Sequence, residues 1–439
     1  MIKSIRKMEL YVKSAMFLSL CIIVHLLVTS YVIKYESDKT TYYKIQDFHY
    51  YIVMIKSFWF KEIVSIYDPK YQLMAIDKYF GTEMNFAYPL GISPTALLIM
   101  LPLSLVARYS FPLANTLWVS VFLSIYAVAV LKIYFRLRAY ERNVLPLFIM
   151  VFSVFFFSFR TVTVIFLGQT SLLASGLLLF LLLELLSARD GQHPPRRFII
   201  YPIMFVLSMK IHYLILGMGI LLLGGYLYEL LASCVIVGLS IAFLIAYTGP
   251  ALWMGFMEQI SLFSAHELPA YYEISNVFHT FITFRSAFAP IIGGPLSLKI
   301  SLIVLSVGCI SIFCLYVFKS AGMGKDRNNL EKFAPLPMIV ALFALLLLFF
   351  PYIGGYEDLL MCVPFAAVCL IPGHAPRKYG RIVVVVPFLF IVLNQSVMSS
   401  AMHLWMFLGM KTSIFVGLFL FSEGAMRTVP ADQQDFGDG

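Results

Sequence analysis

Charge is scarce in this chain. Only 13% of its 439 residues are Asp, Glu, Lys or Arg, whereas 61% are hydrophobic, and the mean hydropathy is +0.87. A soluble protein of this length needs far more polar surface to cover its domains. Instead, apolar runs of roughly 15 to 25 residues recur, near the length of about 20 residues that crosses a bilayer as a helix. The composition therefore excludes a soluble protein or an anchored soluble domain and predicts an integral membrane protein.

Several sequence patterns are also missing. The alternating polar and apolar pattern of a membrane β-strand is absent, which leaves helices to satisfy the backbone hydrogen bonds in lipid. No phosphate-binding loop of a P-loop ATPase, zinc-protease motif or hydrolase nucleophile motif occurs. The six cysteines lie in apolar runs without the spacing of metal ligands, so free core thiols are expected. We predict no cofactor, and the sequence demands no metal.

The positive charge of the chain does not indicate a nucleic-acid partner. The formal net charge is +9, but the lysines and arginines form short clusters at the ends of apolar runs, as is typical of membrane proteins. A basic stripe with exposed aromatic residues is missing. The partner that this pattern indicates is the lipid bilayer. No cleavage site of small residues follows the first apolar run, so we expect an uncleaved first span and a cytoplasmic N-terminus.

The apolar runs predict an all-α polytopic bundle of about 12 transmembrane helices, which forms a single module over residues 1–427. We expect both termini in the cytoplasm, a polar disordered tail over 428–439, and two long outer loops over 34–87 and 250–290. Aromatic residues around Lys56 predict an interfacial helix in the first of these loops, over 48–60. The spans are expected near 13–33, 111–134, 144–160, 165–187, 230–248, 297–318, 335–350, 359–372, 383–397 and 401–421, with one or two more in 198–227.

Two topologies fit the region 88–227. In the first, the proline-rich segment after Tyr88 does not cross the membrane fully and 198–227 crosses it twice. The basic segments 132–142 and 188–197 are then cytoplasmic. In the second, each of these regions crosses once, and the same basic segments lie outside. The placement of positive charge favours the first topology.

One carboxylate, Asp47, lies just past the first apolar run and is the leading catalytic candidate. Its neighbours Phe48, His49, Tyr50 and Tyr51 form an apolar and aromatic setting. Such a setting raises the pKa of a carboxyl group toward the range of a useful general base. The alternative interpretation is an exposed loop carboxylate without a catalytic role.

Two further groups of polar residues are candidates for binding. The 250–290 loop combines carboxylates, histidines and aromatic residues, which suits the hydroxyl groups and rings of a sugar; Asn276, His279 and Arg285 lie in it. Lys210 and His212 interrupt an apolar stretch, where a charge is costly unless it is paired or functional. The functional interpretation is a cation for a lipid phosphate, and the alternative is that Lys210 extends to the membrane surface.

Taken in order, the motifs of the chain resemble those of one family. They are Asp47-Phe48, Tyr67-Asp68-Pro69, Phe86-Ala87-Tyr88-Pro89 with Leu101-Pro102-Leu103, Gly168-Gln169 with Leu173, Lys210 with His212, and Tyr356 with Asp358-Leu359-Leu360. Their order and spacing resemble the bacterial polyprenyl-phosphomannose-dependent mannosyltransferases, glycosyltransferase family 87 of the GT-C superfamily. The family's Tyr-Pro-Pro is Tyr88-Pro89-Leu90 here, and its Lys-Pro is Lys210-Ile211.

The resemblance implies a GT-C-type bundle that transfers a sugar with inversion. It favours mannose as the sugar, a polyprenyl-phosphate donor, a glycolipid or glycan acceptor, and a site on the extracytoplasmic face of the cytoplasmic membrane. The family's catalytic acid lies in the first outer loop, the position that Asp47 occupies. We expect Lys210, His212, His279 and Arg285 to bind the donor phosphate, and Tyr88, Gln169, Asn276, Tyr356 and Asp358 to bind substrate. The alternatives are a transporter or flippase of lipid-linked sugars and an O-antigen polymerase or ligase.

Overall fold

The computed structural model describes most, but not all, of the 439 residues. The described residues are 47–80, 90–140, 148, 152, 161, 164–165, 168–265, 283–322, 335–350, 355–370 and 408–420. Every regular element within these ranges is a helix. Four helical segments there are long and apolar enough to cross a bilayer: Phe111–Arg138, Ser171–Arg189, Leu227–Thr248 and Pro295–Val317. The prediction of a helical membrane protein is thereby confirmed.

The helices follow one another closely along the chain. They are α2 (Asp47–Trp59), α3 (Pro69–Phe80), α4 (Ala96–Ile99), α5 (Leu101–Ala107), α6 (Phe111–Tyr140), α9 (Ser171–Arg189), α10 (Arg197–Leu207), α11 (Ile211–Leu223), α12 (Leu227–Thr248), α13 (Ala251–Ala265), α14 (Phe284–Ile292), α15 (Gly294–Gly322), α16 (Pro335–Phe349), the 3₁₀ turn η4 (Gly355–Met361) and α17 (Cys362–Cys369). A further apolar helix covers Leu408–Leu420.

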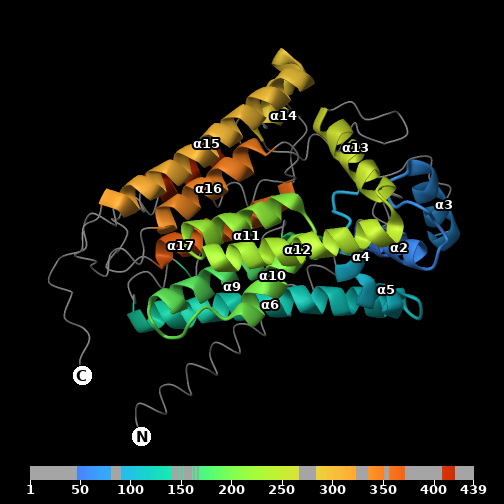
Figure 1. The fold of residues 1–439 in the computed structure, drawn as a ribbon, viewed down its shortest axis with the longest axis horizontal. Helices are drawn as coiled ribbons and strands as arrows, with labels where there is room; N and C mark the ends of the chain where they lie inside the picture. The colour runs from blue at the N-terminus through green and yellow to red at the C-terminus, as the bar shows by residue number, and fades with distance from the viewer. Residues whose placement is uncertain are drawn as a thin grey trace, which may run out of the picture.

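The long helices run between two ends of the bundle, which we name the α2 end and the opposite end. At the α2 end, the Tyr213 hydroxyl near the start of α11 lies 3.4 Å from the Ser171 hydroxyl at the start of α9. At the opposite end, Arg189 at the end of α9 donates a 2.6 Å hydrogen bond to the Gly224 carbonyl just after α11. Helices α9 and α11 are therefore parallel, and the connecting helix α10 runs against both. Figure 1 shows α2, α3 and α13 gathered at the α2 end, on the right.

The region 198–227 contains two antiparallel helices rather than one kinked span. The helices α10 and α11 have 11 and 13 residues, and the chain breaks between them at Ser208–Lys210. The hydroxyl groups of Ser93 and Thr95 bind the Ser208 carbonyl at this break, at 2.6 and 2.9 Å. The helices α4 and α5 that follow have only 4 and 7 residues, too few to cross a bilayer. The chain on both sides of this break therefore consists of short helices.

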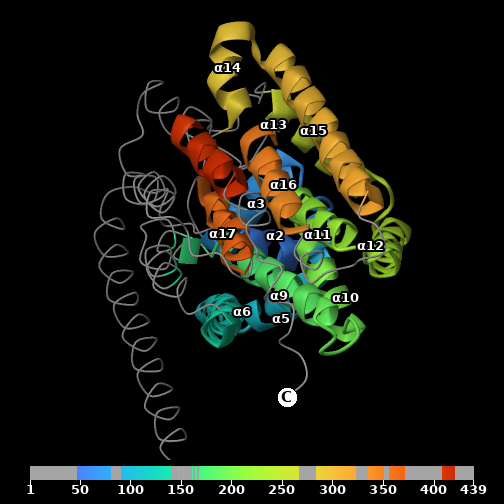
Figure 2. The same cartoon turned by 90° about the vertical axis from the view of Figure 1, so that its left-hand side faces the viewer.

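Burial separates interior helices from peripheral ones. In the apolar stretch of α9, 83% of the residues are buried, whereas in that of α15 only 6% are. Large apolar side chains on α12 and α15, such as Leu239, Ile303 and Ile310, are exposed. Such surfaces are stable when they contact lipid tails. Figure 2, a view along the bundle, shows α11 packed among α9, α10, α12 and α16. The first turns of α9 and α11 therefore begin inside the bundle.

The helix predicted to lie at the membrane interface does form, but protein covers its middle. In α2, Phe48 and Ile52 are fully buried, and α3, α5 and α6 pack against the helix. The physical reason is that the middle of α2 is apolar on all sides, so it is more stable inside the protein than at a polar surface. The Trp59 side chain at its end donates a 2.9 Å hydrogen bond to the Leu97 carbonyl of α4. This hydrogen bond connects the end of α2 to α4, the short helix that precedes α5.

The described cysteines are free thiols, but the prediction that they lie in the core is wrong for Cys234 and Cys314, which are exposed on the surface of the bundle. They are Cys234, Cys309, Cys314, Cys362 and Cys369, and Cys21 lies outside the described residues. Cys362 and Cys369 at the two ends of α17 are buried, where an uncharged thiol packs as a small apolar group.

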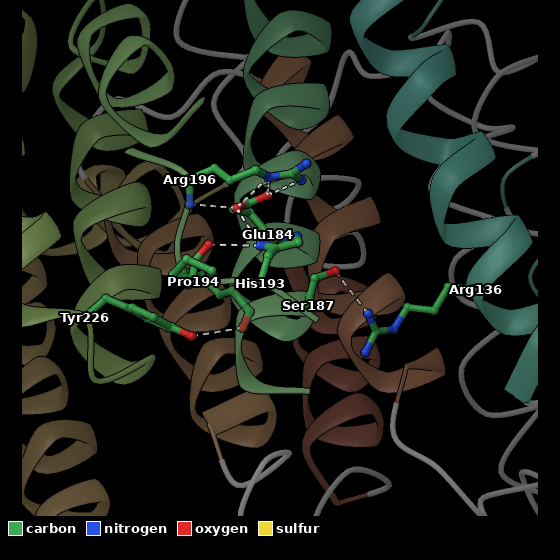
Figure 3. Close-up of polar contacts among 8 residues, drawn as sticks. Arg136, Glu184, Ser187, His193, Pro194, Arg196 and Tyr226 are labelled. Atoms are coloured by element: carbon green, nitrogen blue, oxygen red, sulfur yellow. Dashed lines mark hydrogen bonds and ion pairs between the residues drawn. The ribbon is translucent and has the colours of Figure 1, made fainter. Parts of the chain in front are cut away.

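At the opposite end, a buried carboxylate of α9 holds the start of α10 (Figure 3). The Arg196 backbone nitrogen and Nε donate hydrogen bonds of 2.9 and 3.0 Å to Glu184 Oε1, and His193 Nδ1 lies 3.6 Å from the same oxygen. Arg136 of α6 pairs with Asp190 just after α9. The two basic segments that the sequence analysis places on the same face of the membrane therefore meet here.

Candidate functional site

Asp47 is the first residue of α2, and its side chain contacts the segment just before α9. Gln169 Nε2 donates a hydrogen bond to Asp47 Oδ2. An acidic side chain is also favourable at a helix N-terminus, where backbone N–H groups point outward. Burial is the largest influence on the Asp47 carboxyl and raises its pKa from 3.8 to about 6, although Lys210 and the Gln169 hydrogen bond act in the opposite direction. Asp47 thus has the proton affinity of a general base near neutral pH.

A glycine allows α9 to begin this close to α2. Gly168 has a φ of +67°, and a Cβ atom added there would lie 2.4 Å from the Cβ of Phe48. Glycine is the residue that adopts this backbone conformation without steric cost. The Trp118 Nε1 of α6 donates a 3.0 Å hydrogen bond to the Gly168 carbonyl. The Gly168–Gln169 pair thereby presents the Gln169 amide to Asp47.

A buried ion pair lies at the start of α11. Lys210 Nζ donates a 2.8 Å hydrogen bond to Glu357 Oε1 of η4, and both residues are almost fully buried. His212 Nε2 lies 3.7 Å from the same oxygen, and the Tyr213 hydroxyl lies 3.3 Å from it. Burial alone would raise the pKa of Glu357, but Lys210 and then His212 outweigh burial and lower that pKa to about 2. Glu357 is therefore ionised and compensates the charge of Lys210.

Tyr213 connects the ion pair to the segment that contacts Asp47. Its hydroxyl lies 3.4 Å from those of Thr170 and Ser171, the two residues that follow Gln169. Lys210 lowers and Glu357 raises the pKa of Asp47, so both charges act on the Asp47 carboxyl. The starts of α2, α9 and α11 and the turn η4 therefore form one buried polar cluster at the α2 end.

The structure brings together Asp47, Gln169, Lys210 and His212 of the predicted residues. It adds Glu357, which the sequence analysis did not assign to the site although it lies in the Tyr356-Glu357-Asp358 motif. A buried lysine requires an acidic partner, and this requirement could have pointed to Glu357 from the sequence. Asp358 instead forms a 2.7 Å salt bridge with Lys411 of the helix Leu408–Leu420.

The other predicted residues fall in different parts of the molecule. Arg285 is buried in the first turn of α14. Its neighbour Phe284 stacks on Phe349 at the end of α16, with 4.7 Å between ring centroids, and the Phe350 ring lies 5.5 Å from that of His212. The start of α14 is therefore at the α2 end as well. Tyr88, Asn276 and His279 lie outside the described residues, as does the side chain of Tyr356, whose backbone belongs to η4.

The cluster offers acid–base chemistry and a charge-compensated lysine. Within the described ranges, no group of three or more His, Cys, Asp and Glu residues could hold a metal ion. The described part of the site combines one carboxyl with a raised pKa, one amide donor and one buried ion pair.

No family model, no curated protein and no solved structure matches this chain.

Proposed function

We propose that this protein is an inverting glycosyltransferase of the membrane. It transfers a sugar, with mannose favoured by the motif resemblance, from a polyprenyl-phosphate donor to an envelope glycolipid or glycan. The observation that carries the proposal is Asp47: a buried carboxyl with a pKa of about 6, held by Gln169 and within electrostatic reach of a lysine. A carboxyl with this proton affinity is suited to general-base catalysis at neutral pH.

The proposed reaction is a single displacement. Asp47 accepts the proton of an acceptor hydroxyl as the oxygen attacks the anomeric carbon of the sugar. The bond between that carbon and the phosphate oxygen breaks, and the bond's electrons leave with the polyprenyl phosphate. A cation close to the leaving group stabilises the negative charge that develops on it. Lys210 is the candidate, because only one of its three N–H donors is used by Glu357 in the described contacts.

We infer that the α2 end faces the extracytoplasmic side. The opposite end carries Arg136, Arg189, Arg196 and Arg197, and clusters of positive charge are typical of the cytoplasmic side. Nucleotide sugars are not available outside the cytoplasmic membrane, so a site on that side needs a donor carried by a lipid. Exposed apolar helices such as α12 and α15 would contact the bilayer that holds the polyprenyl chain.

A transporter of lipid-linked sugars is the second candidate. The observation that favours it is the buried Lys210–Glu357 ion pair at a break between two short helices, because broken helices and buried charges are common at the substrate sites of transporters. A transporter does not need Asp47 as a base. The two candidates therefore differ in what a change of Asp47 should do.

The test is an assay of the purified protein in lipid nanodiscs with radiolabelled polyprenyl-phosphomannose and a lipid extract of the cell envelope as acceptor. We expect Asp47→Asn to reduce transfer by about 10²- to 10⁴-fold, while donor binding stays close to wild type and the folded protein is at least as stable as wild type. The matched control is Asp77→Asn, the same change at an exposed position of α3, which should retain activity. Equal transfer by wild type and Asp47→Asn would refute the role of Asp47. Flux of a lipid-linked sugar without any transfer would favour the transporter.

A further inference from the structure

A carboxylate that the reaction above does not use lies at the centre of the buried charges. Glu357 Oε1 is 2.8 Å from Lys210 Nζ, 3.3 Å from the Tyr213 hydroxyl and 3.7 Å from His212 Nε2. These three partners come from the start of α11, whereas Glu357 comes from η4, 147 residues after Lys210. Three polar atoms at the start of α11 thus surround a single oxygen atom of Glu357.

We propose that Glu357 is a positioning residue for the transfer reaction: it holds Lys210 in place and compensates its charge, so that Asp47 remains an effective base. The inference rests on the proposed function, because it concerns the reaction in which Asp47 accepts a proton.

A positive charge close to a carboxyl group lowers the pKa of that group. A buried ammonium without a counter-ion favours the ionised carboxylate and makes it a weaker base. The N-terminus of α11 adds a partial positive charge at the same place, because Lys210 precedes its first turn. The Glu357 carboxylate offsets both, because its Oε1 atom lies close to the lysine nitrogen and to the first residues of α11.

Within the part of the chain that the structure describes, the charged and titratable groups around Asp47 come from three elements. They are Tyr51 of α2, Lys210 and Tyr213 at the start of α11, and Glu357 of η4. Lys78 of α3 and Arg108 after α5 act on Lys56, which lies near the other end of α2. Among the described groups near Asp47, Lys210 and Glu357 are a pair of opposite charge. Both charges act on the base, in opposite directions.

Geometry supports the same role. The Tyr213 hydroxyl that contacts Glu357 also lies 3.4 Å from the hydroxyl groups of Thr170 and Ser171. These residues directly follow Gln169, whose amide donates to Asp47. A change at Glu357 therefore reaches Asp47 both through the electrostatic field and through the contacts of Tyr213.

The test is the pH dependence of kcat/KM, whose acid limb reports the essential base of the free enzyme. Glu357→Gln removes a negative charge, so we expect the acid limb to move to lower pH by about one pH unit and the rate at alkaline pH to fall. Lys210→Met removes the positive charge, so the limb should move to higher pH. In the double variant the limb should return toward the wild-type position, because the pair as a whole is neutral.

The matched control is Glu184→Gln. Glu184 is likewise a buried glutamate paired with a basic residue, but it lies at the opposite end of α9. This variant should lower the thermal unfolding temperature without moving the acid limb. Glu357→Asp, which keeps the charge, should leave the limb near its wild-type position. An acid limb that stays in place in both Glu357→Gln and Lys210→Met overturns the proposal, and Lys210→Met decides alone if Glu357→Gln does not fold.

A measurement without substrate separates this inference from the proposed function. The infrared C=O band of the Asp47 carboxyl group, identified by its absence from Asp47→Asn, can be titrated in each variant. We expect the midpoint of this band to shift in the same directions as the acid limb. If wild type transfers no sugar but the midpoints shift, the proposed reaction fails and the charge coupling stands. If transfer occurs but the midpoints coincide, the role of Glu357 fails alone.

Discussion

The side-chain nitrogen of Gln169 donates a hydrogen bond to Oδ2 of Asp47 across a separation of 122 residues. The contact joins the first residue of α2 to the start of α9, the helix with the most deeply buried apolar segment among the four long ones. A hydrogen bond to a carboxylate favours its ionised form, whereas burial favours the protonated form. The proton affinity of Asp47 reflects this competition together with the charges of Lys210 and Glu357.

Replacement of Gln169 by leucine should therefore weaken Asp47 as an ionised base at neutral pH. Without the hydrogen bond, the ionised form of Asp47 loses a stabilising contact, and burial raises the pKa of Asp47 further. The acid limb of kcat/KM therefore moves to higher pH by about one pH unit. The measurement is the pH profile of sugar transfer. The control is Gln72→Leu, because Gln72 is a buried glutamine that donates a 2.8 Å hydrogen bond to the Ile66 carbonyl. That variant should lose stability with an unchanged profile; coincident profiles for Gln169→Leu and wild type would contradict the prediction.

The raised pKa of Asp47 predicts how stability depends on pH. The folded-state pKa of about 6 lies above the ordinary value of 3.8, so the folded protein binds this proton more tightly than the unfolded chain does. The stability from this group is fully present below pH 3.8 and is lost as pH rises through about 6. The difference corresponds to about 3 kcal/mol.

Asp47→Asn should remove this loss, because an asparagine stays neutral. The variant should therefore be more stable than wild type at alkaline pH by up to about 3 kcal/mol, even though it is inactive. Unfolding in nanodiscs by denaturant, followed at a series of pH values, provides the measurement. Parallel stability curves for the two proteins would show that Asp47 has an ordinary pKa.

Gly168→Ala should disturb the site more than a similar change elsewhere. The added Cβ would lie 2.4 Å from the Cβ of Phe48, the residue next to Asp47. We expect a cost of about 1 to 2 kcal/mol from the backbone conformation and about 1 to 3 kcal/mol more from the steric clash, with a loss of activity.

Gly191→Ala is the matched control for this change. Gly191 also has a positive φ, of +73°, but an added Cβ would meet no atom within 4 Å. It should therefore show only the backbone cost and retain activity. Thermal unfolding and transfer assays of both variants provide the comparison, and equal effects of the two changes would mean that the close approach of α9 to Phe48 is unimportant.

The proposed orientation predicts the accessibility of two exposed positions. Lys70 in α3 lies at the α2 end and Gln192 after α9 lies at the opposite end, and both are exposed. In a background whose native cysteines are replaced by alanine, Lys70→Cys should react with a membrane-impermeant maleimide in intact cells. Gln192→Cys should react only after the membrane is permeabilised. Labelling of both from the same side would refute an orientation in which the two ends face opposite compartments.

Much of the fold could be predicted from the lengths of apolar runs. Helices α6, α9, α12 and α15 agree with predicted spans within several residues at most ends, because a continuous apolar run has few alternatives to a buried or lipid-facing helix. The break at Ser208–Lys210 was predictable as well, since polar residues interrupt an apolar stretch there. The burial of α2 was not predictable, because an aromatic-rich segment suits a protein interior as well as a membrane surface.

The sequence alone is enough to predict a helical membrane protein, in which Asp47 and Gln169 each lie at the start of a helix and Lys210 interrupts an apolar stretch. Which of these side chains meet depends on the tertiary structure. Glu357 and Asp358 are adjacent acids of one motif, yet Glu357 pairs with Lys210 and Asp358 pairs with Lys411. The physical reason is that hydrogen bonds and buried ion pairs act over a few ångströms. Partners more than one hundred residues apart in the chain are therefore selected by the packing of helices and not by the local sequence.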